Sequence, residues 1–262
     1  MGKVLAVWSQ SRRSGKSIVT YMLARHMAES GNLRILVCCL NYKSSSLYRL
    51  LNVPASAAGL EELVNCGITE EHFFSIIPNS EKLFFLGSYK MSNSYASKNI
   101  TKYADLFGRL KDSFDLVLVD AASEAENVLT RLVLDRADMV IKLYCQDIES
   151  IKDIKPDREI LSSTYQQRVN LVSQYRSIYP KAIDIRRKIG PERLFTLEYC
   201  AILQEMNNRG SLYKYMQLNT VFNTSISKIS RYLMMILEID AGEKATSESF
   251  IGWIKGFRRL RE

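Results

Sequence analysis

The chain has 262 residues, of which 47% are hydrophobic and 24% are charged, the composition of a globular protein with a substantial core and not of a disordered one. Its formal net charge of +8 permits attraction to anionic lipid or nucleic acid but shows neither. With 2 His and no clustered Cys or acidic ligands, a dedicated metal site is not expected, and 5 Cys without Cys-x-x-Cys spacing predict reduced structural thiols in the cytosol. No signal-peptide layout and no membrane-spanning apolar run are present, so we expect neither secretion nor a transmembrane segment.

The first predicted element is a strand over Lys3–Trp8, and it leads through the polar residues 9–17 into a helical pattern over Ile18–Ala28. This order is typical of a phosphate-binding loop. In such a loop, backbone N–H groups and a helix N-terminus face a phosphate, a Lys adds charge, and a Ser or Thr hydroxyl reaches a metal ion.

Gly15, Lys16 and Ser17 stand at the positions that this chemistry requires. The complete motif has a further glycine at position 10, where this chain has Gln10. A plain strand-to-helix turn is the alternative, with Gly15 relieving backbone strain and Lys16 in solvent.

Strand-like and helix-like segments then alternate along the chain. The expected further strands are Arg34–Leu40, Leu83–Leu86, Leu116–Val119, Met139–Leu143, Val169–Ser173 and Arg193–Leu197, and the helical patterns include Thr101–Leu110, Ile148–Leu161 and Tyr199–Asn207. Gly31 and Gly210 are placed as helix stops. The alternation predicts an α/β fold with a three-layer, mostly parallel, doubly wound sheet, the P-loop NTPase fold, which binds ligands at the carboxyl ends of its strands.

Two polar stretches interrupt this rhythm. Ser88–Asn99 is rich in Ser and Asn and is predicted to be a mobile loop, and Asp240–Ser249 is a polar stretch after the helical pattern Val221–Ile239. We therefore expect an α/β domain over residues 1–239, a linker over 240–248 and a tail over 249–262.

Three further segments carry a resemblance to a known family: FDLVLVDAA at Phe114–Ala122, ADMVIKLYCQDIESIKD at Ala137–Asp153 and LFTLEYCAILQEMNNRGSL at Leu194–Leu212. In this order, and with the loop before them, they resemble the MinD/ParA group of P-loop ATPases with a deviant Walker A loop, which includes pole-localisation proteins similar to TadZ and CpaE. The resemblance implies ATP and Mg²⁺ as cofactors and a homodimer.

The resemblance also implies a set of site residues. The nucleotide would contact Ser11, Arg12, Arg13, Ser14, Gly15, Lys16, Ser17 and Ile18. Asp120, at the end of the Walker B-like strand, would hold Mg²⁺ together with Ser17 and is the one candidate for a catalytic residue. The alternative for Asp120 is a structural role in which it caps the following turn.

The chain departs from the family loop, which reads Lys-Gly-Gly-x-Gly-Lys-Ser/Thr and whose first Lys reaches the partner's nucleotide across the dimer. Ser11 replaces that Lys, and Arg12 and Arg13 replace the two glycines. If these sites need positive φ, each arginine costs roughly 1 to 2 kcal/mol and reshapes the loop. The arginines either bind phosphate in place of the Lys, lie in solvent, or contact another group.

The family also has an acidic residue just after its second strand, where it helps to position the attacking water and the metal. No Asp or Glu occurs here between Gly31 and Leu60, and the corresponding stretch is Leu40–Ser46, with Tyr42 among its residues. We therefore expect ATP hydrolysis to be weak or absent.

The tail is predicted to form an amphipathic basic helix similar to the membrane-binding tail of MinD-like proteins. Its expected membrane contacts are Phe250, Ile251, Trp253, Ile254, Lys255, Phe257 and Arg258. One short helix binds weakly, so dimerisation would be needed to strengthen attachment. In the alternative, the tail packs on the domain itself or on a partner protein.

These features favour a cytoplasmic, peripherally membrane-associated ATP-binding protein, poor in hydrolysis, that marks a membrane site for a pilus, secretion or division machine of unknown identity. A partition-type protein that binds DNA non-specifically through the basic residues of Arg168–Arg193 is the main alternative. A metabolic enzyme of the same superfamily is a third reading, but no paired cysteines are available for an iron-sulfur cluster.

Overall fold

A computed structural model describes residues 2–42, 47, 50, 59–66, 73–75, 82–88, 91–124, 126–152 and 167–239. In this part of the chain the strands are β1 (Lys3–Trp8), β2 (Ile35–Cys39), β3 (Phe74–Ser75), β4 (Leu83–Gly87), β5 (Leu116–Asp120), β6 (Met139–Cys145), β7 (Gln167–Tyr175) and β8 (Arg193–Glu198). They form one sheet in the order β3-β4-β2-β5-β1-β6-β7-β8, in which every pairing is parallel except that of β3 with β4.

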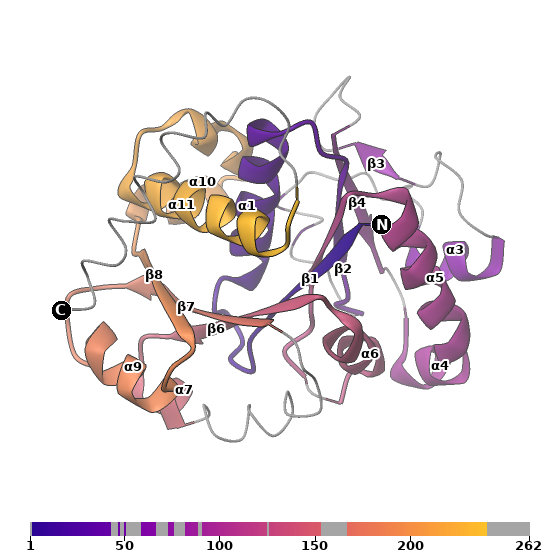
Figure 1. Ribbon diagram of the computed structural model, residues 1–262, viewed down its shortest axis with the longest axis horizontal. Coiled ribbons are helices and arrows are strands. Elements are labelled where there is room, and N and C mark those ends of the chain that lie inside the picture. The colour runs from indigo at the N-terminus through magenta and orange to yellow at the C-terminus, as the bar shows by residue number, and fades with distance from the viewer. Residues whose placement is uncertain are drawn as a thin grey trace.

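The described helices are α1 (Lys16–Ser30), α3 (Leu60–Cys66), α4 (Asn93–Lys98), α5 (Ile100–Ser113), α6 (Val128–Arg136), α7 (Ile148–Lys152), α9 (Ala182–Ile189), α10 (Ala201–Asn208) and α11 (Val221–Ile236), with a 3₁₀ helix, η2, at Leu212–Gln217. Figure 1 shows α1, α10 and α11 on one face of the sheet and α4, α5 and α6 on the other. The expected three-layer α/β fold is confirmed.

The central strands form because their side chains are apolar on both faces, as parallel strands between two helical layers require. All five residues of β2 and of β5 are buried. Alternate residues feed two separate cores: Leu5 and Val7 of β1 pack under α1 and α11, whereas Ala6 and Trp8 pack under α5 and α6. The sheet thus holds its strands rigidly and brings their carboxyl ends to one edge.

That edge collects the residues after β1, β2 and β5. Val7 pairs with Asp120 on one side of β5, and Cys39 pairs with Asp120 on the other. The loop before α1 and the end of the Walker B-like strand therefore meet, as the parallel arrangement predicts.

Some predicted boundaries were wrong. Ser88–Asn99 contains α4, whose first turn is capped by the Ser92 hydroxyl accepting from Tyr95 N at 3.1 Å. The last helix stops at Ile236, short of Ile239, because Glu238 adopts a left-handed φ of 54°. Of the predicted helix Ile148–Leu161, only α7 lies in the described residues, and the linker and tail lie outside them.

No helix in the described part of the chain combines the length and apolarity needed to cross a bilayer.

Candidate functional site

A cavity of about 1020 Å³ opens at the carboxyl edge of the sheet, above the N-terminus of α1. Several segments line it: residues 12–19 from the loop and α1, residues 120–124 at and after the end of β5, Asn41 after β2, and the end of β7. Opposite chain segments, from the end of β8 to α10, contribute residues that include Glu198, Tyr199 and Leu203. The two arginines that replace the glycines of the family loop line this cavity but do not close it.

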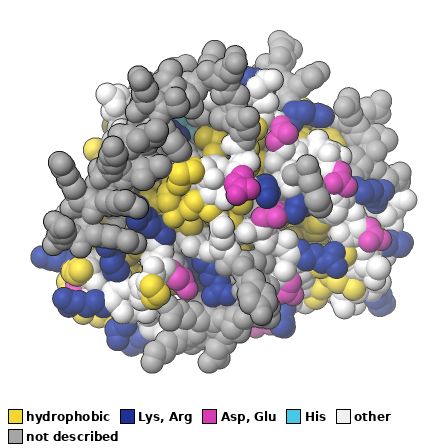
Figure 2. Space-filling model, in the orientation of Figure 1, with side chains coloured by type: hydrophobic (Ala, Val, Ile, Leu, Met, Phe, Trp, Pro, Cys, Tyr) yellow, Lys and Arg dark blue, Asp and Glu magenta, His cyan; other side chains and the backbone are white. Residues whose placement is uncertain are grey.

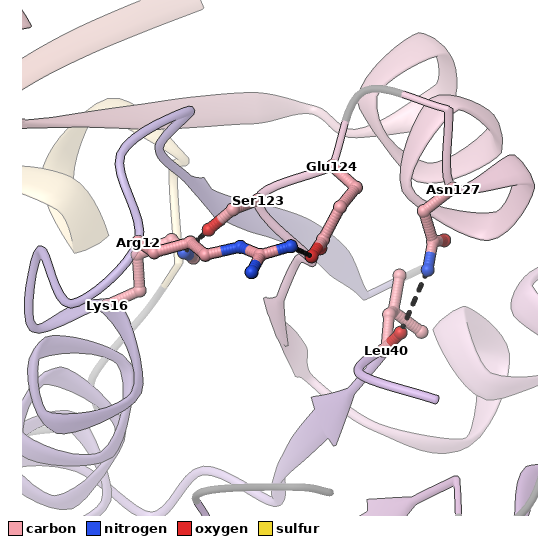
Figure 3. Close-up of polar contacts among 6 residues, drawn as sticks. All are labelled: Arg12, Lys16, Leu40, Ser123, Glu124 and Asn127. Carbon is pink, nitrogen blue, oxygen red and sulfur yellow. Dashed lines mark hydrogen bonds and ion pairs between the residues drawn. The ribbon is translucent and has the colours of Figure 1, made fainter. Parts of the chain in front are cut away.

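Lys16 is the first residue of α1, and its side chain crosses to the segment after β5. Its ammonium donates a hydrogen bond to the Ser123 hydroxyl (Figure 3). Burial lowers the pKa of Lys16, while the nearby Asp120 carboxyl opposes that shift. A desolvated ammonium at the floor of a cavity is a strong electrostatic partner for an anion.

Ser17 and Asp120 form the second polar pair. The Ser17 hydroxyl donates to Asp120 Oδ2 at 2.6 Å, and the Cys39 thiol lies 3.7 Å from the same oxygen. Asp120 is buried, and that burial raises its pKa although the Ser17 hydrogen bond opposes the rise. The structure therefore brings the two predicted metal residues, Ser17 and Asp120, into direct contact.

The loop backbone is bent into the cavity by two left-handed residues. Gly15 has φ 83° and Arg13 has φ 60°, so one of the family's glycine positions is filled by a strained arginine. Ser173 of β7 fixes the loop from outside by donating to the Ser14 carbonyl at 2.6 Å. No side chain caps the start of α1, which leaves the first-turn N–H groups directed toward the cavity.

The remaining predicted loop residues lie at the periphery. Arg12 pairs with Glu124 at 2.7 Å, and both side chains are well exposed, at 77% and 49% (Figure 3). Ser11 contacts the Ser150 hydroxyl at 3.0 Å and does not line the cavity, whereas Ile18 does. Of the alternatives for the two arginines, Arg12 therefore contacts another group, the Glu124 carboxylate.

Sequence reasoning missed the polar residues that hold these groups. Ser123 and Glu124 lie three and four residues after the end of the Walker B-like strand. This position, at the edge of the sheet where ligands bind, is the sequence feature from which they could have been predicted as site residues. Asn127 was also missed; it donates to the Leu40 carbonyl at 3.3 Å and so links the residue after β2 to the start of α6 (Figure 3). Ser173 carried no signal, because it is one of several polar residues in β7 and stands in no recognisable motif.

The donors fit a nucleotide phosphate and its cation. The Ser14 hydroxyl is buried without a hydrogen-bond partner among the described residues, next to an ammonium, a hydroxyl and an uncapped helix end. A Mg²⁺ ion would be held through Ser17 and Asp120 and would neutralise phosphate charge. From the end of β2 the cavity receives Asn41 and no carboxylate among the described residues, in keeping with the predicted lack of an acidic helper.

Comparisons with known proteins agree on the fold. No family model matches the sequence, and no curated protein matches it. The solved structures similar to this chain include a ParA family ATPase from Chlorobium tepidum, with a TM-score of 0.74, 14% identity, and coverage of 88% of this chain and 98% of that one. The septum site-determining protein MinD from Pyrococcus horikoshii, in complex with Mg-ADP, has a TM-score of 0.73 and 15% identity, over 93% of this chain and 100% of that one. MinD from Aquifex aeolicus has a TM-score of 0.73 and 17% identity, over 94% of this chain and 99% of that one.

The chain therefore has a P-loop NTPase fold. Within this class, its fold is the one shared by the MinD and ParA ATPases, as the resemblance implied.

Proposed function

We propose that this protein is a MinD/ParA-like ATP-binding protein that hydrolyses ATP weakly or not at all and marks a membrane site for a larger assembly. Its organisation would be an ATP-binding domain over residues 1–239, a linker over 240–248 and a membrane-binding tail over 249–262. The carrying observation is the convergence of Lys16, Ser17 and Asp120 on one open cavity above an uncapped helix.

ATP binding is supported by charge and by relatives of the same fold. The cavity offers a buried ammonium and backbone N–H groups to the phosphates, and its far wall, from β8 and α10, offers Tyr199 and Leu203 to the base. A MinD of this fold was solved with Mg-ADP, and a McdA variant from Cyanothece was solved with ATP.

The binding test is thermal unfolding with and without millimolar ATP or ADP and Mg²⁺. We expect a clear rise in Tm, because a ligand at a hundredfold its Kd adds about 2.7 kcal/mol to the free energy of unfolding. Lys16→Ala should lose the rise, while Lys228→Ala, an exposed Lys on α11, should keep it. Equal Tm values with and without nucleotide in the unaltered protein would overturn ATP binding.

Poor hydrolysis is supported by the missing acidic residue after β2. Without a carboxylate there, the attacking water is positioned less well. Phosphate release should therefore stay near background at saturating ATP. Turnover at the rate of an active switch ATPase, abolished by Lys16→Ala, would contradict this part and leave binding intact.

The positioning role is supported by the resemblance and by the predicted tail. MinD and McdA structures show the same fold, and one MinD structure is a complex with MinC. We expect the chain to co-sediment with anionic vesicles and Trp253→Glu to weaken this binding. Equal binding by the full chain and Trp253→Glu would remove the tail as the anchor.

A further inference from the structure

Six of the eight large hydrophobic side chains that are exposed among the described residues follow the carboxyl ends of three neighbouring strands, β6, β7 and β8. These six are Ile148, Ile178, Tyr179, Ile183, Tyr199 and Ile202; the other two, Leu218 and Val221, lie elsewhere. Exposed apolar side chains that lie together on a protein surface are a mark of an interaction site.

The centre of this group is the connection between β7 and α9. Ile178 and Tyr179 are 58% and 71% exposed, and Ile183 in the first turn of α9 is 53% exposed. We call the surface formed by these three residues with the exposed basic residues Arg176, Lys181, Arg186, Arg187 and Lys188 the α9 surface.

The connection is held in shape by one amide. Gln146 Nε2 donates to the carbonyls of Arg176, Ile178 and Pro180 at 2.7 to 2.9 Å, and Gln146 Oε1 accepts from Arg176 N at 2.7 Å. Pro180 is buried, so it packs inward while its two apolar neighbours point out. The outward display of Ile178 and Tyr179 is thus built into the fold and costs little ordering entropy on contact.

The surroundings are strongly basic. Between Arg176 and Lys188 the chain has 5 basic residues and 1 acidic residue, Asp184. All five basic side chains are exposed, and on α9 Ile183 shares a face with Arg186 and Arg187 at i+3 and i+4. Figure 2 shows Lys and Arg side chains around hydrophobic ones at the lower left, where Figure 1 places α9.

Nearby acidic residues reduce this charge but do not cancel it. Glu149 of α7 pairs with Lys152 at 2.6 Å, and Asp184 lies 3.8 Å from Arg187. Asp147, just before α7, accepts hydrogen bonds only from the neutral Ser150, so it lowers the positive charge, but basic residues stay in excess. A second copy of the same basic surface would therefore be repelled, and an anionic partner is favoured.

We infer that the α9 surface is a second membrane contact, in which Ile178, Tyr179 and Ile183 enter the headgroup region of an anionic bilayer while the basic side chains bind lipid phosphates. A Tyr and two Ile side chains beside Lys and Arg are suited to the bilayer interface, where apolar groups enter the membrane and basic groups stay at the phosphates. Side chains that protrude from the surface can enter a bilayer without a matching pocket, which a protein partner would have to provide. Duplex DNA gains little from exposed isoleucines. This second contact rests on the proposed membrane function, but it requires neither bound nucleotide nor the tail.

The test is co-sedimentation of the full chain with vesicles of phosphatidylcholine containing phosphatidylglycerol, and with phosphatidylcholine alone as the neutral probe. Ile178→Ser with Tyr179→Ser should weaken binding to the anionic vesicles by about tenfold, because apolar area no longer leaves water. The matched control is Val221→Ser, which removes a side chain that is 67% exposed on α11.

The charge part is tested by replacing Arg186, Arg187 and Lys188 with Gln, which should weaken anionic binding by about tenfold or more and flatten its salt dependence. The control removes the same charge from the exposed Lys98, Lys102 and Arg109 on α4 and α5 and should change binding far less. Far-UV circular dichroism confirms that each variant is folded.

Unchanged vesicle binding by both α9 variants, with binding lost in Trp253→Glu, would overturn the second contact and leave the tail and the proposed function standing. Failure of every form to bind vesicles would overturn both. If the α9 variants lose binding to a DNA duplex, or lose a dimer in sedimentation, while vesicle binding is unchanged, the surface belongs to that partner and the membrane assignment is wrong.

Discussion

Arg13 is the residue at which the phosphate-binding loop is most strained. Its φ of 60° lies in the left-handed region, which costs a non-glycine residue about 1 to 2 kcal/mol. We expect Arg13→Gly to raise the free energy of unfolding by up to about 1 kcal/mol, since the relief is partly offset by the freer unfolded chain.

Arg12 provides the matched control for that change, because it is not among the residues with positive φ. Arg12→Gly should lower stability slightly, through added unfolded-state entropy and loss of an exposed ion pair worth little. Urea unfolding measures the free energy of unfolding of both variants. If Arg13→Gly is less stable than Arg12→Gly, Arg13 is not strained.

Asp120 carries the clearest dependence on pH. Burial raises its pKa in the folded protein, so the folded state keeps a proton that the unfolded chain has already released. The stability contribution is therefore present below the unfolded pKa and is lost as pH rises toward the raised folded value. We expect Asp120→Asn to become progressively more stable relative to the unaltered protein as pH rises through that window.

Urea unfolding across a pH series measures this effect, with Asp105→Asn, an exposed change on α5, as the control. The same Asp120→Asn variant should lose the Mg²⁺-dependent part of the thermal shift by ATP, because a neutral amide holds the cation poorly. Parallel pH profiles for the two proteins would show that Asp120 is not destabilised by its burial.

The position of the loop before α1 could be predicted from the sequence, whereas the side chains that support this loop could not. Lys16 and Ser17 follow from the order of strand, loop and helix, and Asp120 from the end of an apolar strand. Ser123 and Ser173 depend on which strands become neighbours, and that information is spread over the whole chain. The ion pair of Arg12 with Glu124 likewise joins segments that no local pattern connects.

Among the elements, the central strands β1 and β5 were predicted best, because side chains buried on both faces leave an unbroken apolar run. The predicted Lys3–Trp8 matches β1, and Leu116–Val119 falls one residue short of β5. Polar α4 was missed, since its helix is set by the Ser92 cap and by packing of Ala96 and not by an amphipathic pattern. The two-residue β3 is too short to give any periodicity.

Asn127 joins two elements and should be sensitive to change. Its Oδ1 accepts from Thr130 N at 2.9 Å and caps α6, while its Nδ2 holds the Leu40 carbonyl after β2. Because both hydrogen bonds are buried, Asn127→Ala should lower the free energy of unfolding by about 1 to 3 kcal/mol. Asn127→Ser should restore the cap of α6 but not the hydrogen bond to the Leu40 carbonyl, and so should recover part of the loss. Equal chemical stability of all three proteins would show that the side chain does not stabilise this edge.

In the proposed function, one nucleotide site acts together with a weakly binding membrane tail, so attachment should depend on the number of tails per particle. If ATP and Mg²⁺ bring two chains together, the second tail binds at a high effective concentration, and vesicle affinity should rise by about 10² or more without a new lipid contact. Sedimentation velocity with and without ATP and Mg²⁺ should show the dimer, and co-sedimentation should show the matching rise. Lys16→Ala should stay monomeric and bind vesicles at the basal level. A dimer that forms equally in Lys16→Ala would show that association does not depend on the phosphate-binding loop, and the exposed apolar residues after β6, β7 and β8 would then be the first place to look for it.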